Sequence, residues 1–206
     1  MVLGAVLLSS QQQESLKEMG VKDSKRLSPR KRESLAEKIR EMSIQVRWEY
    51  AWPETIDEYC RKNFLNLLEA RIAASLVMAM RPEALYIDAP GKNGRKFKAQ
   101  MEWACKELGE KERALWPGEI VAENHADANY PVVSAASIIA KVERDREIEK
   151  LRQQFGDFGS GYPGDSKTVR FLQEYYREHH GFPSCVRRSW QTIQRIEQRE
   201  SSWFSL

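Results

Sequence analysis

Short apolar runs along this chain are separated by longer segments with helical periodicity. Val2–Leu8 is an unbroken apolar run, which predicts a buried strand followed by a polar Ser-Gln turn. Ile44–Ala51 alternates apolar and polar residues, as a half-buried strand does. Ala84–Ile87 and Glu119–Glu123 are two further predicted strands. Strands separated by helices are typical of an α/β domain.

The segments between the strands carry helix signals. Ser28 before Pro29 predicts a helix start, because Ser is a good N-cap and Pro suits the first helical position. A long helical region is expected from Pro53 to Met80. Its apolar stripe, expected to face the sheet, comprises Phe64, Leu67, Leu68, Ile72 and Leu76. Further helices are expected at Lys96–Glu107, Val132–Lys150, Ser166–Glu178 and Ser189–Glu200. We therefore predict an α/β core over residues 1–150 and a helical C-terminal portion with a substrate-binding loop over residues 151–206.

Composition narrows the class of protein. The chain has 206 residues, of which 41% are apolar and 31% charged, and this is the make-up of a folded globular protein. Its apolar runs are too short to span a membrane, so no membrane partner is expected, and Met1–Leu8 lacks the basic start of a signal peptide. The 3 cysteines show no metal-site spacing and favour a reducing compartment, so we expect the protein in the cytoplasm.

Positive charge gathers near the start of the chain. The net charge is only +3, yet Lys22–Arg40 holds eight Lys or Arg residues and three Asp or Glu residues. Such a segment is usually a solvated helix face. Here the charges begin in the predicted loop Lys22–Arg26, where Lys side chains and backbone amides together suit a phosphate. Both interpretations stay open from the residues alone.

Two carboxylates follow two consecutive strands. Asp88 directly follows the predicted strand Ala84–Ile87. Asp127 comes shortly after the predicted strand Glu119–Glu123, in or beside a loop. Ligands collect at the carboxyl ends of strands in open α/β sheets, and carboxylates there suit Mg²⁺ or Mn²⁺. A single Asp before a helix is more often an N-cap or turn residue, so that alternative stays open for Asp127.

The helix after Asp127 starts with small residues, from Ser134 to Ser137, and carries Lys141 on a later turn. Small residues let a backbone or a ligand approach closely near the positive end of a helix. They equally well indicate close packing, and an exposed helix lysine needs no functional explanation.

Five segments occur in the same order as in ribonuclease HII. They read DSKRLSPRKRE from Asp23, YIDA from Tyr86, HADANYPVVSAASIIAKVERDR from His125, GSGYPGDSKT from Gly159 and FPSCVRRSW from Phe182. The chain resembles the archaeal and eukaryotic branch, because its loop reads GSGYP. The resemblance implies a ribonuclease H-like fold, with a mixed sheet flanked by helices. It also implies a two-metal (Mg²⁺ or Mn²⁺) endonuclease that hydrolyses the RNA strand of RNA–DNA hybrids, including single ribonucleotides in DNA, in DNA replication and repair.

The resemblance also implies roles for particular residues. Asp88 and Asp127 match two of the family's metal-binding catalytic carboxylates. Tyr162 matches the tyrosine that stacks on the sugar following the ribonucleotide. The remaining substrate-binding residues that it suggests are Lys25, Lys141, Ser24 and Ser134.

One family motif has no counterpart in this sequence. Family members begin with a strand and a DEAGRGP-like motif that supply two more carboxylates and the loop that senses the 2′-hydroxyl. That strand is central, between the strands that match Val2–Leu8 and Ala84–Asp88. We therefore expect two unpaired strand edges that face each other, and little cleavage by the chain as written. Three explanations stay open: a translation start set too late, a truncation that needs a partner strand, or a non-catalytic RNA–DNA hybrid-binding protein.

The C-terminal tail carries Trp203 and Phe204 behind a charged helix. The pair resembles the aromatic residues of sliding-clamp peptides, which implies a clamp as a possible partner. Glu197 and Glu200 stand where such peptides have Gln and an aliphatic residue. The alternative is an aromatic anchor that packs the last helix on the domain.

Overall fold

The computed structural model describes residues 1–21, 27–108 and 116–203, the last three for their backbone only. Backbone contacts divide the chain into two compact units. The first, here the strand unit, comprises Val2–Tyr50 and Leu65–Arg144. The second, here the helical unit, comprises Met1, Ala51–Phe64 and Asp145–Leu206. Each unit is described by itself.

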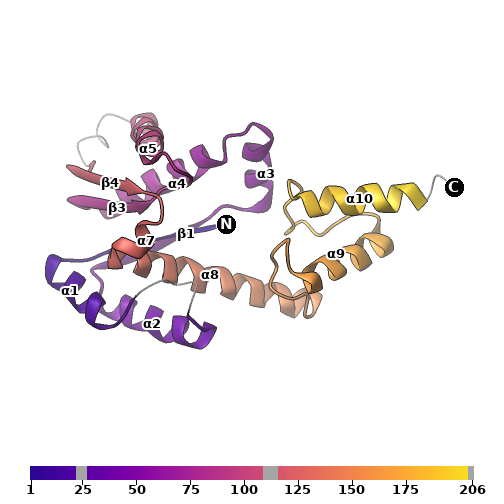
Figure 1. Cartoon of the computed structure of the whole chain (residues 1–206), viewed down its shortest axis with the longest axis horizontal. Helices are drawn as coiled ribbons and strands as arrows, with labels where there is room; N and C mark the ends of the chain where they lie inside the picture. The colour runs from indigo at the N-terminus through magenta and orange to yellow at the C-terminus, as the bar shows by residue number, and fades with distance from the viewer. Residues whose placement is uncertain (22–26, 109–115, 204–206) are drawn as a thin grey trace. The chain divides into compact units, whose positions relative to one another are not determined.

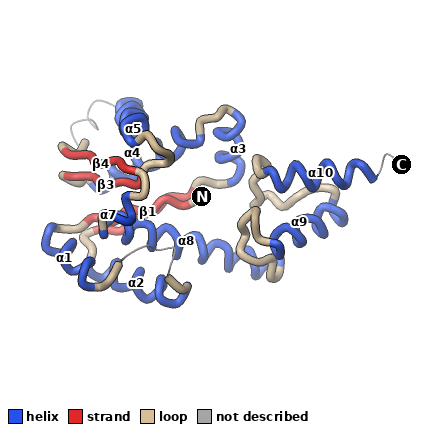
Figure 2. Tube along the Cα trace, viewed as in Figure 1, coloured by secondary structure: helices blue, strands red, loops and turns tan. Residues whose placement is uncertain are grey.

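The strand unit contains two separate pairs of strands, drawn in red in Figure 2. Strand β1 (Val2–Leu7) is antiparallel to β2 (Gln45–Tyr50), and β3 (Ala84–Asp88) is parallel to β4 (Glu119–Glu123). Among the described residues, β1 and β3 form no ladder with each other, so each keeps one edge without a strand partner. The four predicted strands are thus confirmed. The expected unpaired edges of β1 and β3 are confirmed as well.

Helices cover both faces of these strands in the strand unit (Figure 1). They are α1 (Ser10–Glu18), α2 (Pro29–Met42), α4 (Leu65–Met80), α5 (Gly94–Leu108), α7 (Ala126–Asn129) and the first part of α8 (Pro131–Phe155). One core cluster joins α1, α2 and α8 around Leu16, Ile39 and Ile138, and another joins α4 and α5 around Phe97 and Met101.

Local capping explains one helix that the sequence pattern missed. The polar turn expected after β1 is instead helix α1. The Ser9 hydroxyl accepts a hydrogen bond from the Gln12 N–H (3.3 Å), and the Gln12 side chain accepts one from the Ser9 N–H (2.8 Å). This reciprocal capping satisfies two backbone donors at the helix start. The predicted start of α2 is confirmed, since the Ser28 hydroxyl accepts from the Lys31 N–H (3.3 Å).

Strand β1 packs tightly against α8. A side-chain carbon added to Gly4 would lie 2.5 Å from the Ala136 carbonyl oxygen and 2.9 Å from the Ala140 nitrogen, so glycine is required there. The same helix carries Glu143, which is buried and accepts a hydrogen bond from Arg40 of α2 at 2.6 Å. The small residues at the start of α8 therefore allow close packing, as one of the two interpretations of the sequence expected.

The helical unit consists of α3 (Pro53–Arg61), the end of α8, α9 (Ser166–His179) and α10 (Gln191–Trp203). Its core cluster is Leu172, Phe182, Ile193 and Ile196. The buried Asp57 of α3 accepts hydrogen bonds from the backbone N–H groups of Arg188 (2.6 Å) and Ser189 (2.9 Å). These bonds tie α3 to the segment before α10. Burial raises the pKa of Asp57, but hydrogen bonds from Ser189 and Arg188 and the positive charge of Arg187 together outweigh it and leave the pKa below its usual value.

The prediction of one long helical region from Pro53 to Met80 is wrong. It is divided into α3 and α4, and Asn63 between them has a positive φ of 58°. Asn tolerates this conformation better than most residues, which suits it to a helix break. Phe64, expected on the apolar stripe that faces the sheet, is instead 53% exposed at that break.

Candidate functional site

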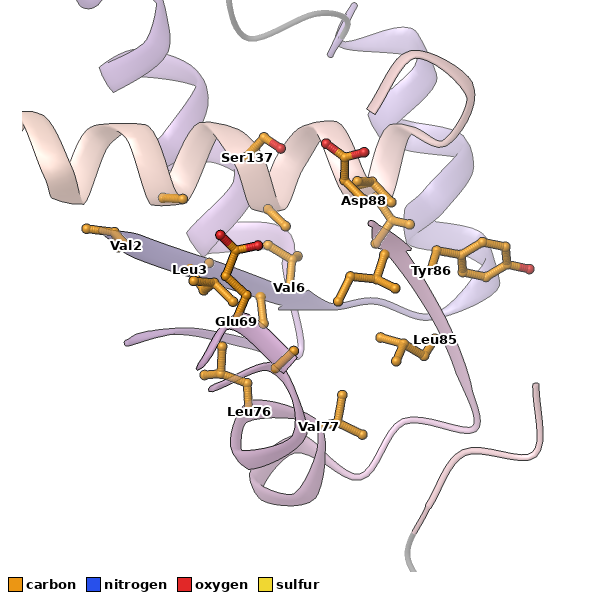
Figure 3. Close-up of a pocket in the computed structure, with 18 of the residues that line it drawn as sticks. Val2, Leu3, Val6, Glu69, Leu76, Val77, Leu85, Tyr86, Asp88 and Ser137 are labelled. Atoms are coloured by element: carbon orange, nitrogen blue, oxygen red, sulfur yellow. The ribbon is translucent and has the colours of Figure 1, made fainter. Parts of the chain in front are cut away.

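Asp88 is the last residue of β3 and is exposed. The parallel pairing with β4 brings it beside Glu123, because these two residues are register partners. One oxygen of the Asp88 carboxylate accepts a hydrogen bond from the Ala126 backbone N–H at 3.2 Å. Figure 3 draws Asp88 among the residues that line a cavity, with Ser137 of α8 also on its wall. The predicted position of Asp88 at the carboxyl end of a strand is confirmed.

Asp127 lies inside the one-turn helix α7 and is 9% exposed. The sequence predicted Asp127 in or beside a loop, and the structure corrects this to a short helix. His125 is the N-cap residue of α7 and has a left-handed backbone conformation with φ 60°. The Ser134 hydroxyl donates to the Asp127 carbonyl oxygen at 2.5 Å, which fixes α7 against the start of α8.

The hydrogen bond to Ala126 brings the two predicted acids into one part of the molecule, since Ala126 immediately precedes Asp127. Mg²⁺ commonly takes one or two carboxylates and completes its shell with water and substrate phosphate. A pair of carboxylates such as Asp88 and Asp127 would suffice for one such ion. Within the described ranges no group of three or more His, Cys, Asp or Glu residues is arranged to hold a metal. These residues therefore do not by themselves form a site for two ions, which usually takes roughly three or four acidic ligands.

Glu123 is an acid near this site that the sequence analysis did not select. It ends β4 beside Asp88, and its carbonyl oxygen accepts from the Ala89 N–H at 2.8 Å. Its carboxylate accepts a hydrogen bond from the Tyr130 hydroxyl at 3.3 Å. Burial of the Tyr130 ring and the charge of Glu123 raise the pKa of Tyr130. The signal was available in the sequence, because Glu123 ends a predicted strand as Asp88 does.

The other predicted substrate-binding residues of the strand unit have different surroundings. Ser134 is fully buried, so its hydroxyl supports the Asp127 backbone and does not reach the surface. Lys141 is half-buried on α8. Ser24 and Lys25 lie outside the described residues, as does the rest of the predicted phosphate-binding loop.

Tyr162 belongs to the helical unit and is 49% exposed. The loop that carries it is held by Asp165, whose carboxylate accepts from the Ser160 N–H (2.5 Å), the Ser160 hydroxyl (2.7 Å) and the Thr168 hydroxyl (3.2 Å). These hydrogen bonds lower the pKa of Asp165 to about 2. Gly159 has φ 86°, and a side-chain carbon there would lie 2.4 Å from the Asp165 carboxylate. The loop is thus fixed, and its tyrosine faces solvent.

Comparison with known proteins assigns the chain to a family. The family model described as ribonuclease HII matches residues 1–193. The chain belongs to the ribonuclease HII family. It is 41% identical to ribonuclease HII of Pyrococcus furiosus over 200 residues, which cover 96% of this chain and 84% of that protein.

Two solved structures of archaeal relatives resemble the fold. The ribonuclease H2 of Pyrococcus horikoshii matches with a TM-score of 0.83 and 38% identity, over 96% of this chain and 90% of that one. The ribonuclease HII of Archaeoglobus fulgidus, solved in complex with PCNA, matches with a TM-score of 0.79 and 39% identity, over 96% and 89% of the two chains. The predicted ribonuclease H-like α/β fold is confirmed, and the chain is a ribonuclease HII-type hydrolase.

Proposed function

We propose that this ribonuclease HII-family protein cuts the RNA strand of RNA–DNA hybrids, including at single ribonucleotides embedded in DNA. The observation that carries the proposal is the junction of β3 and α7. There the Ala126 N–H donates to the carboxylate of Asp88, the last residue of β3, and Asp127 is the next residue along α7. Acids in this position suit a divalent cation that also contacts a phosphate.

In this proposal Asp88 and Asp127 hold Mg²⁺ or Mn²⁺. A bound divalent ion supplies two effects, a lower pKa for a coordinated water and stabilisation of the leaving 3′-oxygen. The chain itself orients the acids. Asp88 is exposed and available to a ligand, while Ser134 and the Ala126 N–H fix the backbone that carries Asp127. We assign Lys141, on α8, to contact the phosphate backbone of the nucleic acid. We assign Tyr162 to stack on the substrate sugar.

We also propose that the 206-residue chain alone turns over slowly. The support is the absence, in the described part of the chain, of a third acid arranged with these two for metal binding. The alternative function is binding of RNA–DNA hybrids without cleavage, which the same residues serve if phosphate contacts persist and the ion does not bind.

A cleavage assay separates these functions. The substrates are a duplex with one ribonucleotide, a full RNA–DNA hybrid and an all-DNA duplex, each with Mn²⁺ or Mg²⁺. We expect slow cleavage of the first two, with 5′-phosphate and 3′-hydroxyl products, and none of the third. Asp88→Asn is expected to remove the cleavage, and Glu37→Gln on the exposed face of α2 to preserve it. Salt-dependent hybrid binding with no product, in the wild type, favours the binding function. Equal cleavage of all three duplexes contradicts the proposal.

A sliding clamp is the protein partner that we propose, through the C-terminal tail. The support is the pair Trp203 and Phe204, whose side chains lie outside the described residues, together with the Archaeoglobus fulgidus relative solved with PCNA. Trp203→Ala is expected to weaken capture of the protein by immobilised clamp. Trp103→Ala, which removes an exposed tryptophan of α5, is the control. Unchanged capture of the Trp203→Ala variant would remove this partner.

The state of the cysteines bears on where the protein acts. The three cysteines, all among the described residues, form no disulfide, which suits the cytoplasm that we propose as its location. Within the described ranges, the helices include none with the length and apolar character needed to span a bilayer.

A further inference from the structure

Strand β2 has one edge that no described strand covers. Within the described ranges β2 pairs with β1 alone, so its other edge carries no ladder. Trp48, in the middle of this strand, is 37% exposed. An open strand edge presents backbone N–H and C=O groups that can pair with another chain.

The ladder with β1 fixes which backbone groups of β2 face the open edge. The Leu7 carbonyl oxygen accepts a hydrogen bond from the Ile44 N–H at 2.9 Å, so Leu7 directs its C=O toward β2. Leu7 is the register partner of Gln45, and bonded pairs recur at every second residue of an antiparallel ladder. Gln45 and Arg47 therefore direct their N–H and C=O toward β1. Trp48 directs these groups to the open edge.

Two opposite charges lie on one face of this strand. Arg47 and Glu49 are two residues apart, so their side chains project from the same face of β2. The Ser75 hydroxyl of α4 donates to the Glu49 carboxylate at 2.9 Å and holds it in place. Arg47 is exposed, and within the described ranges no acid forms an ion pair with it. The strand thus carries a positioned negative charge and a positive charge that is open to water.

We propose that β2 pairs edge to edge with β2 of a second copy of this chain, antiparallel and with Trp48 opposite Trp48. A two-fold axis through the centre then makes the two halves of the interface identical. The two Trp48 residues exchange backbone hydrogen bonds, because both direct their N–H and C=O to the open edge. Arg47 of each copy lies opposite Glu49 of the other, at a pair without backbone bonds, where side chains approach closely.

The charges favour this register over its neighbours. Sliding the strands by two residues in one direction places Arg47 opposite Arg47, and in the other direction it places Glu49 opposite Glu49. Like charges directly opposite each other destabilise a strand pair. Sliding by one residue brings groups that face the open edge opposite groups that face β1. The register centred on Trp48 therefore satisfies both the backbone groups and the charges.

The size of the contact sets its strength. Strand β2 has 6 residues, and a stable interface buries roughly 1,200 to 2,000 Å² in total. One pair of such short strands buries less, so the dimer is weak and forms at high protein concentration. The two Trp48 rings project from the same face of the joined sheet and add an aromatic contact.

Sedimentation equilibrium of the 206-residue chain measures the association. We expect a wild-type molar mass that rises with protein concentration from monomer toward dimer. Arg47→Glu makes both cross-strand charge pairs repulsive, so the dimer dissociation constant is expected to rise at least about tenfold. Arg95→Glu, the same charge change at an exposed position of α5, is the matched control and is expected to associate like the wild type. A wild type that stays monomeric leaves this edge to another partner and overturns the proposal, as does unchanged association of Arg47→Glu.

Mixing two variants tests the register directly. Glu49→Lys also places like charges opposite each other, so we expect it to stay monomeric by itself, as Arg47→Glu does. In a heterodimer of the two variants each introduced charge lies opposite an unlike charge, so mixing is expected to restore association. Circular dichroism checks that each variant folds before mixing. Folded variants that stay monomeric when mixed contradict the register.

Amide hydrogen exchange followed by nuclear magnetic resonance tests the backbone pairing. The Trp48 amide is expected to exchange more slowly in concentrated than in dilute protein, because it is bonded only in the dimer. The Arg47 amide, which faces β1, is expected to change little. Equal behaviour of these two amides contradicts pairing through this edge. These measurements use neither nucleic acid nor metal, so their failure leaves the proposed nuclease function untouched.

Discussion

The Asp88 carboxylate lies 3.2 Å from the backbone nitrogen of Ala126 and accepts a hydrogen bond from its N–H. Asp88 therefore has two separable properties, a negative charge and a hydrogen-bond acceptor that holds the start of α7. Asn keeps the acceptor and loses the charge, whereas Ala loses both. The two substitutions thus distinguish the structural role of Asp88 from its proposed role with a cation.

We expect Asp88→Ala to destabilise the protein by about 1 kcal/mol, the usual contribution of one hydrogen bond, and Asp88→Asn to leave stability almost unchanged. Urea denaturation measures the difference. Hydrogen exchange at Ala126 is expected to be faster in the Ala variant alone. Equal destabilisation by both substitutions would contradict the role of Asp88 as an acceptor for α7.

Ser134 offers a test of how Asp127 is positioned. Ser134→Ala removes the buried hydroxyl that donates to the Asp127 carbonyl oxygen and is expected to cost about 1 to 3 kcal/mol of stability. It is also expected to lower kcat while KM stays near the wild-type value, because the acid moves and the substrate contacts do not. Ser43→Ala, which removes a hydroxyl that donates to the Ile39 carbonyl oxygen at the end of α2, is the control. A rise in KM with unchanged kcat would instead indicate that Ser134 contacts substrate.

The ion pair between Arg40 and Glu143 is expected to matter for stability. Glu143 is 5% exposed, its carboxylate lies 2.6 Å from Arg40, and the Tyr50 hydroxyl is 3.5 Å away. Removing one partner of a buried pair leaves the other poorly solvated, so Glu143→Ala is expected to cost roughly 3 kcal/mol. Glu14→Ala, which breaks the exposed pair with Lys17, is expected to cost less than about 0.5 kcal/mol. Equal unfolding midpoints for the two variants would contradict this difference.

The Asp165 loop predicts a specific dependence on pH. The pKa of Asp165 is lowered from 3.8 to about 2, so its carboxylate stabilises the folded loop above its ordinary pKa. That contribution is lost as pH falls from about 4 through about 2, because the unfolded chain takes up the proton first. Asp165→Asn is expected to weaken this dependence without removing it, since Asp57 and Asp157 also have lowered pKa values. Denaturation midpoints of both proteins between pH 5 and pH 2 measure the effect, and parallel curves would contradict it.

The elements that the sequence predicted well are those whose signal is local. The apolar run that forms β1, the alternation that forms β2 and the Ser28 cap of α2 each lie within a few residues. The signals that misled were also local. Ser9 and Gln12 were interpreted as turn residues, although the same residue types form a capping box. The break at Asn63 was missed because its backbone conformation is visible only in the structure.

The candidate site was only partly predictable. The placement of Asp88 follows from the end of its strand, but its contact with Ala126 depends on where α7 packs. The burial of Ser134 depends in the same way on a tertiary contact that no periodicity shows. The roles given to Asp88, Asp127, Tyr162 and Lys141, and the division at residue 150, stay predictions. The family assignment was more secure, since five ordered motifs extend along most of the chain and the family model matches residues 1–193.

The most direct test is whether Asp88 and Asp127 share a cation with nucleic-acid phosphate. Electron paramagnetic resonance measures free Mn²⁺ in titrations of the 206-residue chain, with and without an RNA–DNA hybrid. We predict that the hybrid tightens Mn²⁺ binding several-fold in the wild type and in Glu37→Gln, and that Asp88→Asn and Asp127→Asn lose this gain while remaining folded. A hybrid-dependent gain of the same size in Asp88→Asn would contradict the assignment of the metal to these acids.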